Sequence, residues 1–293
     1  MIATVERLLR VSLTVHDLER MSRFYCDAFG FEPVGRRELD PARMKLLGAP
    51  GARARSQLLA LGAQQIELLE FDPPGRAYPA AATARDPWFQ HIAFVVSDMR
   101  AAWEHLQSLA VTPVSTGGPQ RLPPASGAVT AVKFRDPESH PLELLEFPPG
   151  RGDPRWQRPD PPLFLGFDHS AIVVADASRS RAFYHSQLGF KEQSVSLNRG
   201  PEQQRLDGLP DAEVQVIGLA CPAQPTPHLE LLAYRAPAPP APAAAPGPRD
   251  VAATRVVLEV AQWAAHAALP LEEGARGLAL LDPDGHRLLL IER

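Results

Sequence analysis

The sequence predicts an α+β protein made of four consecutive βαβββ units. Three observations lead to this class. Short runs rich in β-branched residues recur along the chain, a stretch with helical features follows each run, and segments repeat one another at constant offsets. The strand-like runs that open the four units are 12–15, 91–96, 169–174 and 255–260.

The first and third units repeat each other in register. A Phe-Tyr pair and a Gly-Phe pair stand at 24–25 and 30–31 in the first unit, and at 183–184 and 189–190 in the third. An aspartate precedes the helical stretch in each of the first three units, at Asp17, Asp98 and Asp176, and this residue type is favoured as an N-cap. We therefore predict a helix over 99–109 that begins at Asp98, and a corresponding helix that begins at Asp176.

The last strand of the first three units contains Glu-Leu-Leu. The three copies begin at Glu67, Glu143 and Glu230, and Leu288-Leu289-Leu290 is a degenerate fourth copy. An Asp-Pro-x-x-His segment precedes the last strand of the second and fourth units, at 136–140 and 282–286. Asp followed by Pro favours a type I turn between two strands, which completes each unit.

Two proline-rich segments divide the chain. Residues 151–162 are predicted to be a linker, because proline-rich chain stays extended, and 236–249 a Pro/Ala-rich surface loop. We expect a first domain over 1–150, with units at about 6–75 and 86–150. The second domain is expected over 163–293, with units at about 165–236 and 250–293.

Composition excludes several classes of protein. The 293 residues are 45% hydrophobic and 22% charged, which suits a globular core. The net charge of −4 and the absence of a basic stripe argue against nucleic acid or anionic membrane as partners. No apolar run is long enough for a membrane-spanning helix, and the N-terminal segment does not have the pattern of a signal peptide. With Cys26 and Cys221 as the only cysteines, we expect a reduced, cytoplasmic protein.

These motifs together resemble the vicinal oxygen chelate superfamily, which includes glyoxalase I, extradiol dioxygenases, methylmalonyl-CoA epimerase, and fosfomycin and bleomycin resistance proteins. The resemblance covers nearly the whole chain and rests on 90–98, 136–143, 169–176 and 183–190. It implies that the units pair into two cupped, incomplete β-barrels with the helices outside. It also implies a divalent metal ion (Fe, Mn, Zn, Ni or Mg) inside a barrel, with positions left open for two adjacent substrate oxygens.

The resemblance places four ligand positions in each barrel, on the first and last strands of the units. If neighbouring units pair, the first barrel has Arg10, Glu67, His91 and Glu143. Arginine does not ligate metal ions. Two alternatives remain for this barrel: a metal site made by Glu67, His91 and Glu143, or a metal-free barrel in which Arg10 pairs with a glutamate.

The second barrel would then have His169, Glu230, Arg255 and Leu289 at the four positions. Two ligands rarely hold a metal tightly, so we expect an organic-ligand pocket here. Arg255 would bind an anionic group, and His169 or Glu230 would act as acid or base. Loops 115–128 and 196–208 are expected to shape the pocket. We expect His228 to lie at the mouth or to face away from Glu230.

The resemblance therefore implies a metal-dependent lyase, isomerase or dioxygenase that acts on a small molecule with vicinal oxygens. The expected metal ligands are Glu67, His91 and Glu143, and the expected catalytic residues are His169, Glu230, Arg255 and Arg10. The alternative is a metal-free binding or resistance protein of the bleomycin-resistance type. Metal content separates the two. In either case the resemblance implies a small-molecule substrate or ligand as the partner, and we expect a monomer or homodimer.

Overall fold

Strands and helices follow one another along the chain as the repeats predict. The computed structural model describes residues 2–238, 240, 245–263, 268–271 and 274–292. The first unit contains β1 (Ala3–Val15), α1 (Leu18–Phe29), β2 (Glu32–Glu38), α2 (Pro41–Leu46), β3 (Arg53–Leu61) and β4 (Gln64–Asp72). The second contains β5 (Gln90–Val96), α3 (Met99–Gln107), β6 (Thr112–Pro113), β7 (Gln120–Arg121), the 3-10 turn η1 (Pro124–Ser126), β8 (Thr130–Arg135) and β9 (Pro141–Glu146).

The second half of the chain repeats this order. The third unit contains β10 (Phe164–Val173), α4 (Ala177–Leu188), β11 (Lys191–Arg199), α5 (Pro201–Asp207), β12 (Glu213–Ala220) and β13 (His228–Ala236). The fourth contains β14 (Arg255–Trp263), β15 (Leu269–Pro270), β16 (Arg276–Leu281) and β17 (Arg287–Glu292). The helical stretch expected after 255–260 falls largely on 264–267, outside the described residues. In the linker, a 3-10 turn, η2 (Pro154–Trp156), is present.

The helices begin where the sequence predicts. The Asp98 side chain accepts a hydrogen bond from the backbone N–H of Ala101, and Asp176 caps α4 in the same way. At the other end of α1, Gly30 takes a left-handed conformation with φ of 77°, which glycine adopts without strain. None of the described helices is long and apolar enough to cross a membrane.

The described strands form two sheets, and each sheet joins units from both halves of the chain. Sheet A has the order β15-β16-β17-β14-β1-β4-β3-β2, and sheet B the order β11-β12-β13-β10-β5-β9-β8-β6, with β7 paired to β8. Unit 1 therefore pairs with unit 4, and unit 2 with unit 3. The expected pairing of units 1 and 2 in one barrel and units 3 and 4 in the other is wrong. Each unit offers the same opening strand as an edge, so the repeats define the units but not their partners.

The strand register brings the two opening strands of each sheet together. β1 runs antiparallel to β14, with Ser12 opposite Arg255, and β10 runs antiparallel to β5, with Ala171 opposite His91. Each opening strand is also parallel to the last strand of its own unit. The four strands at the middle of a sheet are therefore the ones that carry the ligand positions.

Neighbouring units of one half are held together by a buried Tyr–Asp–His cluster. Tyr25 of α1 donates to Asp136 at 2.9 Å, and His140 lies between Asp136 at 2.8 Å and the carbonyl of Thr14 at 2.9 Å. Burial opposes charge on His140, but Asp136 outweighs it and raises the pKa of the imidazole. This cluster joins the turn before β9 to the first unit, which gives the Asp-Pro-x-x-His motif its structural role.

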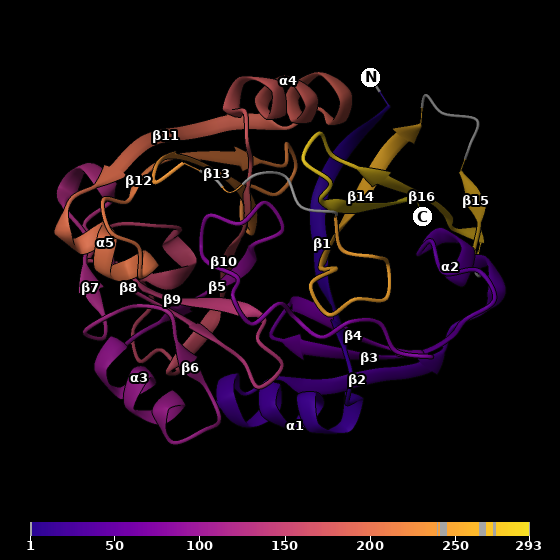
Figure 1. The fold of residues 1–293 in the computed structure, drawn as a ribbon, viewed down its shortest axis with the longest axis horizontal. Coiled ribbons are helices and arrows are strands. Elements are labelled where there is room, and N and C mark those ends of the chain that lie inside the picture. Colours follow the sequence, from indigo (N-terminus) through magenta and orange to yellow (C-terminus); the bar gives the residue numbers. More distant parts are fainter. Residues whose placement is uncertain (1, 239, 241–244, 264–267, 272–273, 293) are drawn as a thin grey trace.

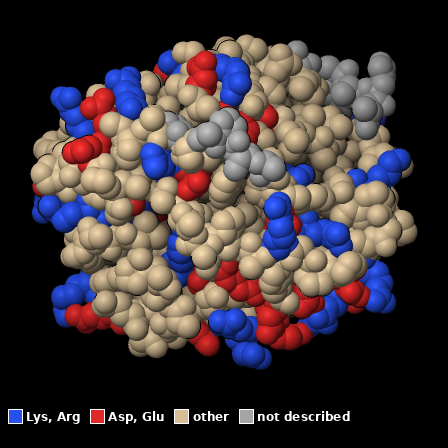
Figure 2. Space-filling view, in the orientation of Figure 1, with Lys and Arg blue, Asp and Glu red and all other residues tan. Residues whose placement is uncertain are grey.

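The main hydrophobic core draws on all four units. It includes Leu13 of β1, Phe94 of β5, Phe167 of β10 and Leu258 of β14, and the ring of Phe29 stacks on Phe94 at 4.2 Å. Figure 1 shows sheet B on the left and sheet A on the right, with α1 and α3 below and α4 above. Figure 2 shows charges of both signs interspersed over this face.

Candidate metal centre

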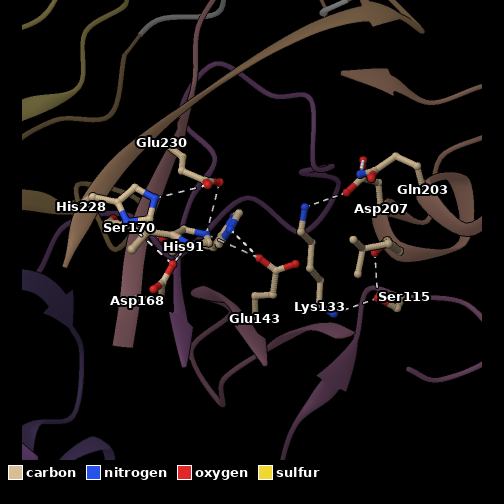
Figure 3. Close-up of polar contacts among 12 residues, drawn as sticks. His91, Ser115, Lys133, Glu143, Asp168, Ser170, Gln203, Asp207, His228 and Glu230 are labelled. Carbon is tan, nitrogen blue, oxygen red and sulfur yellow. Dashed lines mark hydrogen bonds and ion pairs between the residues drawn. The ribbon is translucent and has the colours of Figure 1, made fainter. Parts of the chain in front are cut away.

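Four side chains from four central strands of sheet B line one cavity. They are His91 of β5, Glu143 of β9, His169 of β10 and Glu230 of β13. Alternate residues of a strand share a face, and these strands are neighbours, so one side chain from each meets on the concave face. In Figure 3, His91, Glu143 and Glu230 point toward one another.

The ligand atoms of His91, Glu143 and His169 all lie within 4.8 Å of one another, which suits a shared cation, and Glu230 adjoins this group through His169. His91 Nε2 lies 3.0 Å from Glu143 Oε2, and His169 Nε2 lies 3.8 Å from the same oxygen. The distance from His169 Nε2 to Glu230 Oε2 is 3.4 Å. Both Nε2 atoms are buried and make no hydrogen bond, although both face carboxylates. Orphaned imidazole nitrogens beside buried carboxylates are the donor set of a transition-metal site, so these residues fit a divalent ion.

The charges of the four side chains depend on their surroundings. Burial lowers the pKa of His91, which keeps that ring neutral. Burial has the same tendency at His169, but Glu230, Asp168 and Glu143 outweigh it and raise the pKa to about 10. Despite its burial, Glu143 has a pKa far below the usual range, because Lys133, His169 and His91 stabilise the anion. The cluster is therefore one imidazolium held among ionised carboxylates.

Asp168 orients the ring of His169 from behind. Its carboxylate lies 3.2 Å from His169 Nδ1 and accepts a bond of 3.2 Å from the indole N–H of Trp156 in the linker. A bond at Nδ1 fixes the tautomer that leaves Nε2 available to a metal. Sequence reasoning missed Asp168, because strict alternation would turn it away from its neighbour His169. A register shift between Phe167 and His169 breaks the alternation and lets both line the cavity.

His228 lies on the same side of β13 as Glu230. Its Nε2 is 3.4 Å from Glu230 Oε1, and its ring is 5.3 Å from that of His169. The expectation that it faces away from Glu230 is wrong, because residues two apart on a strand share a face.

A cavity of about 660 Å³ opens in front of these side chains. Loop 115–128 contributes Leu122 and Gly127 to its wall, and segment 196–208 contributes Asn198 and Gln203. Both loops therefore shape the cavity as predicted. Within the second loop, residues Pro201–Asp207 form the short helix α5, which the sequence analysis treated as loop.

A second polar cluster lies beside Glu143. Lys133 of β8 is paired with Glu143 across the strands, and its ammonium group donates to Asp207 of α5 at 2.7 Å. Gln203 Nε2 donates to the other oxygen of Asp207 at 2.7 Å. Figure 3 shows Asp207 and Gln203 beyond Lys133, on the side away from Glu143. The sequence analysis did not single out these three residues.

The equivalent positions of sheet A hold Arg10, Glu67, Arg255 and Leu289. Glu67 Oε2 accepts from Ser12 at 2.6 Å and from Arg10 Nε at 3.2 Å. Burial raises the pKa of such a carboxyl, but here Arg10 and Ser12 outweigh it and lower the pKa. The carboxylate of Glu67 is therefore held by an arginine and a serine hydroxyl.

Arg255 is fully buried in sheet A and bonded to its own chain. Its guanidinium donates to Thr14 Oγ1 at 2.8 Å, to the carbonyl of Ala253 at 2.7 Å and to the carbonyl of Pro248. Leu289 packs in an apolar cluster with Met44 and Leu46 of α2. Leu289 occupies the position in sheet A that corresponds to Glu143 in sheet B, and it belongs to an apolar cluster with side chains of α2.

The site residues proposed from the sequence therefore separate into two groups. His91 and Glu143 meet His169 and Glu230 in sheet B, whereas Arg10, Glu67 and Arg255 lie in sheet A. The expectation that Glu67 converges with His91 and Glu143 is wrong, and so is the expectation that Arg255 lines a pocket with His169. Both errors follow from the pairing of units, since every one of the eight positions lies on the strand assigned to it.

Comparisons with known proteins agree with this fold. The model of the Glyoxalase/Bleomycin resistance protein/Dioxygenase superfamily matches residues 7–144 and 166–290. No curated protein matches the chain.

Among solved structures, glyoxalase I from Zea mays is similar with a TM-score of 0.61 and 18% identity, over 98% of this chain and 92% of that one. A glutamate-to-glutamine mutant of the same enzyme gives a TM-score of 0.62 and 17% identity, over 98% and 94%. A putative dioxygenase from Bacillus subtilis has a TM-score of 0.58 and 10% identity, over 99% and 86%. At these identities the likeness concerns the fold.

Proposed function

Since the chain belongs to the Glyoxalase/Bleomycin resistance protein/Dioxygenase superfamily, we propose that it is a metal-dependent isomerase or lyase. It would move a proton on a carbon next to a carbonyl, in a small molecule with two adjacent oxygens. The single observation that supports this best is the close group of two imidazoles and one carboxylate in sheet B, with both imidazole Nε2 atoms buried and without a hydrogen bond. The carboxylate of Glu230 lies beside this group, 3.4 Å from His169. His91, Glu143, His169 and Glu230 would hold the ion.

Two imidazole and two carboxylate ligands suit a first-row transition ion better than Mg²⁺, which prefers oxygen ligands alone. Such an ion supplies Lewis acidity toward adjacent oxygens of a substrate. His91, His169 and Glu143 would hold the ion, and Glu230, beside His169, would be a fourth ligand. A dioxygenase of the 2-His-1-carboxylate type has three protein ligands, so a fourth ligand from Glu230 would favour proton transfer over oxygen chemistry.

The four ligands would have different tasks. The side chain of Glu143 is 7% exposed and held as an anion by three neighbours, whereas that of Glu230 is 19% exposed and also lines the cavity. Glu230 is therefore the carboxylate that accepts and returns the substrate proton. Asp168 keeps the ring of His169 oriented through Nδ1.

Hydrogen exchange tests this proposal without knowledge of the natural substrate. Hydroxyacetone, which carries adjacent oxygens, is incubated in D₂O with the protein loaded with Ni²⁺ or Zn²⁺, and deuterium incorporation next to the carbonyl is followed by NMR. We expect metal-dependent exchange that the Glu230→Gln variant lacks. Exchange that is equal in the two proteins, or equal with and without metal, would contradict the proposal.

One observation favours a second candidate, a metal-free protein that binds a small molecule without chemistry. The imidazolium of His169 already lies within 3.8 Å of three carboxylates, Glu143, Asp168 and Glu230, and so offsets part of their negative charge without an ion. Elemental analysis of protein purified without chelator separates the candidates. About one equivalent of a divalent transition metal supports the enzyme, and its absence after incubation with metal supports the binding protein.

A further inference from the structure

No lysine or arginine among the described residues that line the sheet B cavity is free to pair with an anionic ligand. Among the described residues that line it, Lys133 is the only lysine or arginine. Its ammonium group is buried and bonded to Asp207 at 2.7 Å, so its charge is already balanced. The carboxylates on the same lining are Glu143, Asp153, Asp168 and Glu230. A carboxylate or phosphate on the ligand would therefore meet like charges in a poorly solvated space.

A buried acceptor stands on the same wall. Gln203 is 3% exposed, and its Oε1 has no hydrogen-bond partner. The orientation of the amide is set, because its NH₂ group donates to the carboxylate of Asp207. An amide oxygen accepts only, so the group that satisfies it must be a donor, such as a hydroxyl or an amide N–H. Leaving such an acceptor unpaired is unfavourable, and a ligand that donates to it removes this cost.

Apolar side chains form part of the remaining wall, beside uncharged polar residues such as Ser196 and Asn198. It includes Leu122, Leu145, Val214, Val216 and Leu232. Such a surface favours an aliphatic or aromatic body between the polar ends of a ligand. Figure 3 shows Gln203 beyond Lys133 on the side away from Glu143, so the donor of the ligand would lie away from the four ligand side chains.

We propose that the cavity takes an uncharged compound with an apolar body, whose vicinal oxygens face the His–Glu cluster and whose far end donates a hydrogen bond to Gln203. The inference rests on the proposed function for the orientation of the vicinal oxygens. The end of the ligand that lies away from the His–Glu cluster carries a hydroxyl or an amide N–H, and it carries no carboxylate or phosphate.

Three catechols that differ at one substituent test it. Binding of 3,4-dihydroxybenzyl alcohol, 4-methylcatechol and 3,4-dihydroxybenzoate is measured by titration calorimetry on the Zn²⁺-loaded and the metal-free protein. We expect the alcohol to bind at least about tenfold more tightly than the benzoate, as one unfavourable charge contact implies. The alcohol should also bind more tightly than 4-methylcatechol, and Gln203→Leu should abolish that second difference.

A charge change behind the wall gives the matched comparison. Asp207→Asn leaves Lys133 without its anion, so the benzoate should gain affinity and the preference for the alcohol should shrink or reverse. Asp27→Asn, on the exposed side of α1, removes the same charge from the protein and should leave the preference unchanged.

The inference is overturned if the wild-type protein binds the benzoate as tightly as the alcohol, or binds none of the three compounds. Zinc titration on the same samples reports on the proposed function alone. A protein that binds no zinc but prefers the alcohol would contradict the metal-dependent activity and retain the inference about the ligand.

Discussion

Glu67 and Glu230 occupy the same register position in sheets A and B, opposite Ser12 and Ala171 on the opening strands. Exchange of each for glutamine is nearly isosteric, yet the two changes should have different consequences. Glu67 accepts hydrogen bonds from Ser12 at 2.6 Å and from Arg10 at 3.2 Å. In the glutamine variant both partners can still bond to the amide oxygen, but this oxygen no longer carries a negative charge. Glu230 lies 3.4 Å from His169 in the cluster proposed to hold the metal.

The structure gives the size of the first effect. A hydrogen bond to a charged group contributes about 1.5–3 kcal/mol, and loss of one member of a buried ion pair costs about 3–5 kcal/mol. The side chain of Arg10 is 11% exposed and keeps some contact with water, so we expect Glu67→Gln to lower the free energy of unfolding by about 2–3 kcal/mol. At roughly 2–4 °C per kcal/mol, the melting temperature falls by about 5–10 °C. Metal affinity should not change.

The Glu230→Gln substitution should have the opposite pattern of effects, with a large loss of metal affinity and a smaller loss of stability. Loss of a partner that merely orients a ligand costs about 10–100-fold in metal affinity, so loss of a charged ligand should cost at least about 100-fold. The metal-free protein should lose less stability than with Glu67→Gln, because His169 keeps Asp168 and Glu143. Calorimetry on metal-free samples and competition with a chromophoric chelator measure the two quantities. Equal loss of metal affinity in both variants, or none with Glu230→Gln, would refute the assignment of the metal to sheet B.

Three further outcomes are expected. Because the pKa of His169 is raised to about 10, its ring is protonated at pH 8 in the metal-free protein. Metal binding at pH 8 should therefore release about one proton. Metal affinity should rise about tenfold per pH unit up to the pKa of His169. Calorimetry in buffers of different protonation enthalpy measures this, and no proton release at pH 8 would contradict it. Asp168→Asn should weaken metal binding about 10–100-fold, with a smaller effect on folding, as chelator competition would show; unchanged affinity would remove its positioning role. Leu289→Ala should lower the free energy of unfolding by about 2–5 kcal/mol in a denaturant titration, since it opens a cavity in the apolar cluster that includes Met44. The metal content of the variant should not change. Loss of metal would argue for an ion in sheet A.

Much of the fold could be predicted from the sequence because its determinants are local. The N-caps Asp98 and Asp176 and the turns at Asp136 and Asp282 depend on side chains that bond to backbone a few residues away. The same motifs recur in register, which defines the four units. Local signals do not determine which unit faces which, because all four opening strands present equivalent edges.

The candidate site shows the same division. His91, Glu143, His169 and Glu230 were all recognised as ligand positions, but the assumed pairing assigned two of them to each barrel. Once unit 2 is paired with unit 3, the set is complete. The sequence analysis missed residues that reach the site only through irregular strand geometry. Asp168 reaches the site through a shift in strand register.

The other site residues that the sequence did not predict are placed by contacts between residues far apart in the chain. Asp207 belongs to α5, a helix of the third unit, and its carboxylate meets Lys133 of the second unit beside the cavity. No local pattern predicts a contact between residues 74 positions apart in the chain. Such pairs follow only from the way in which the two units share a sheet.

Anomalous diffraction from crystals grown with Co²⁺ tests the central claim most directly. The account predicts one strong peak per chain within ligand distance of His91, Glu143, His169 and Glu230. A strong peak between Arg10 and Glu67 in sheet A, or no peak at the sheet B cluster in fully loaded crystals, would contradict it.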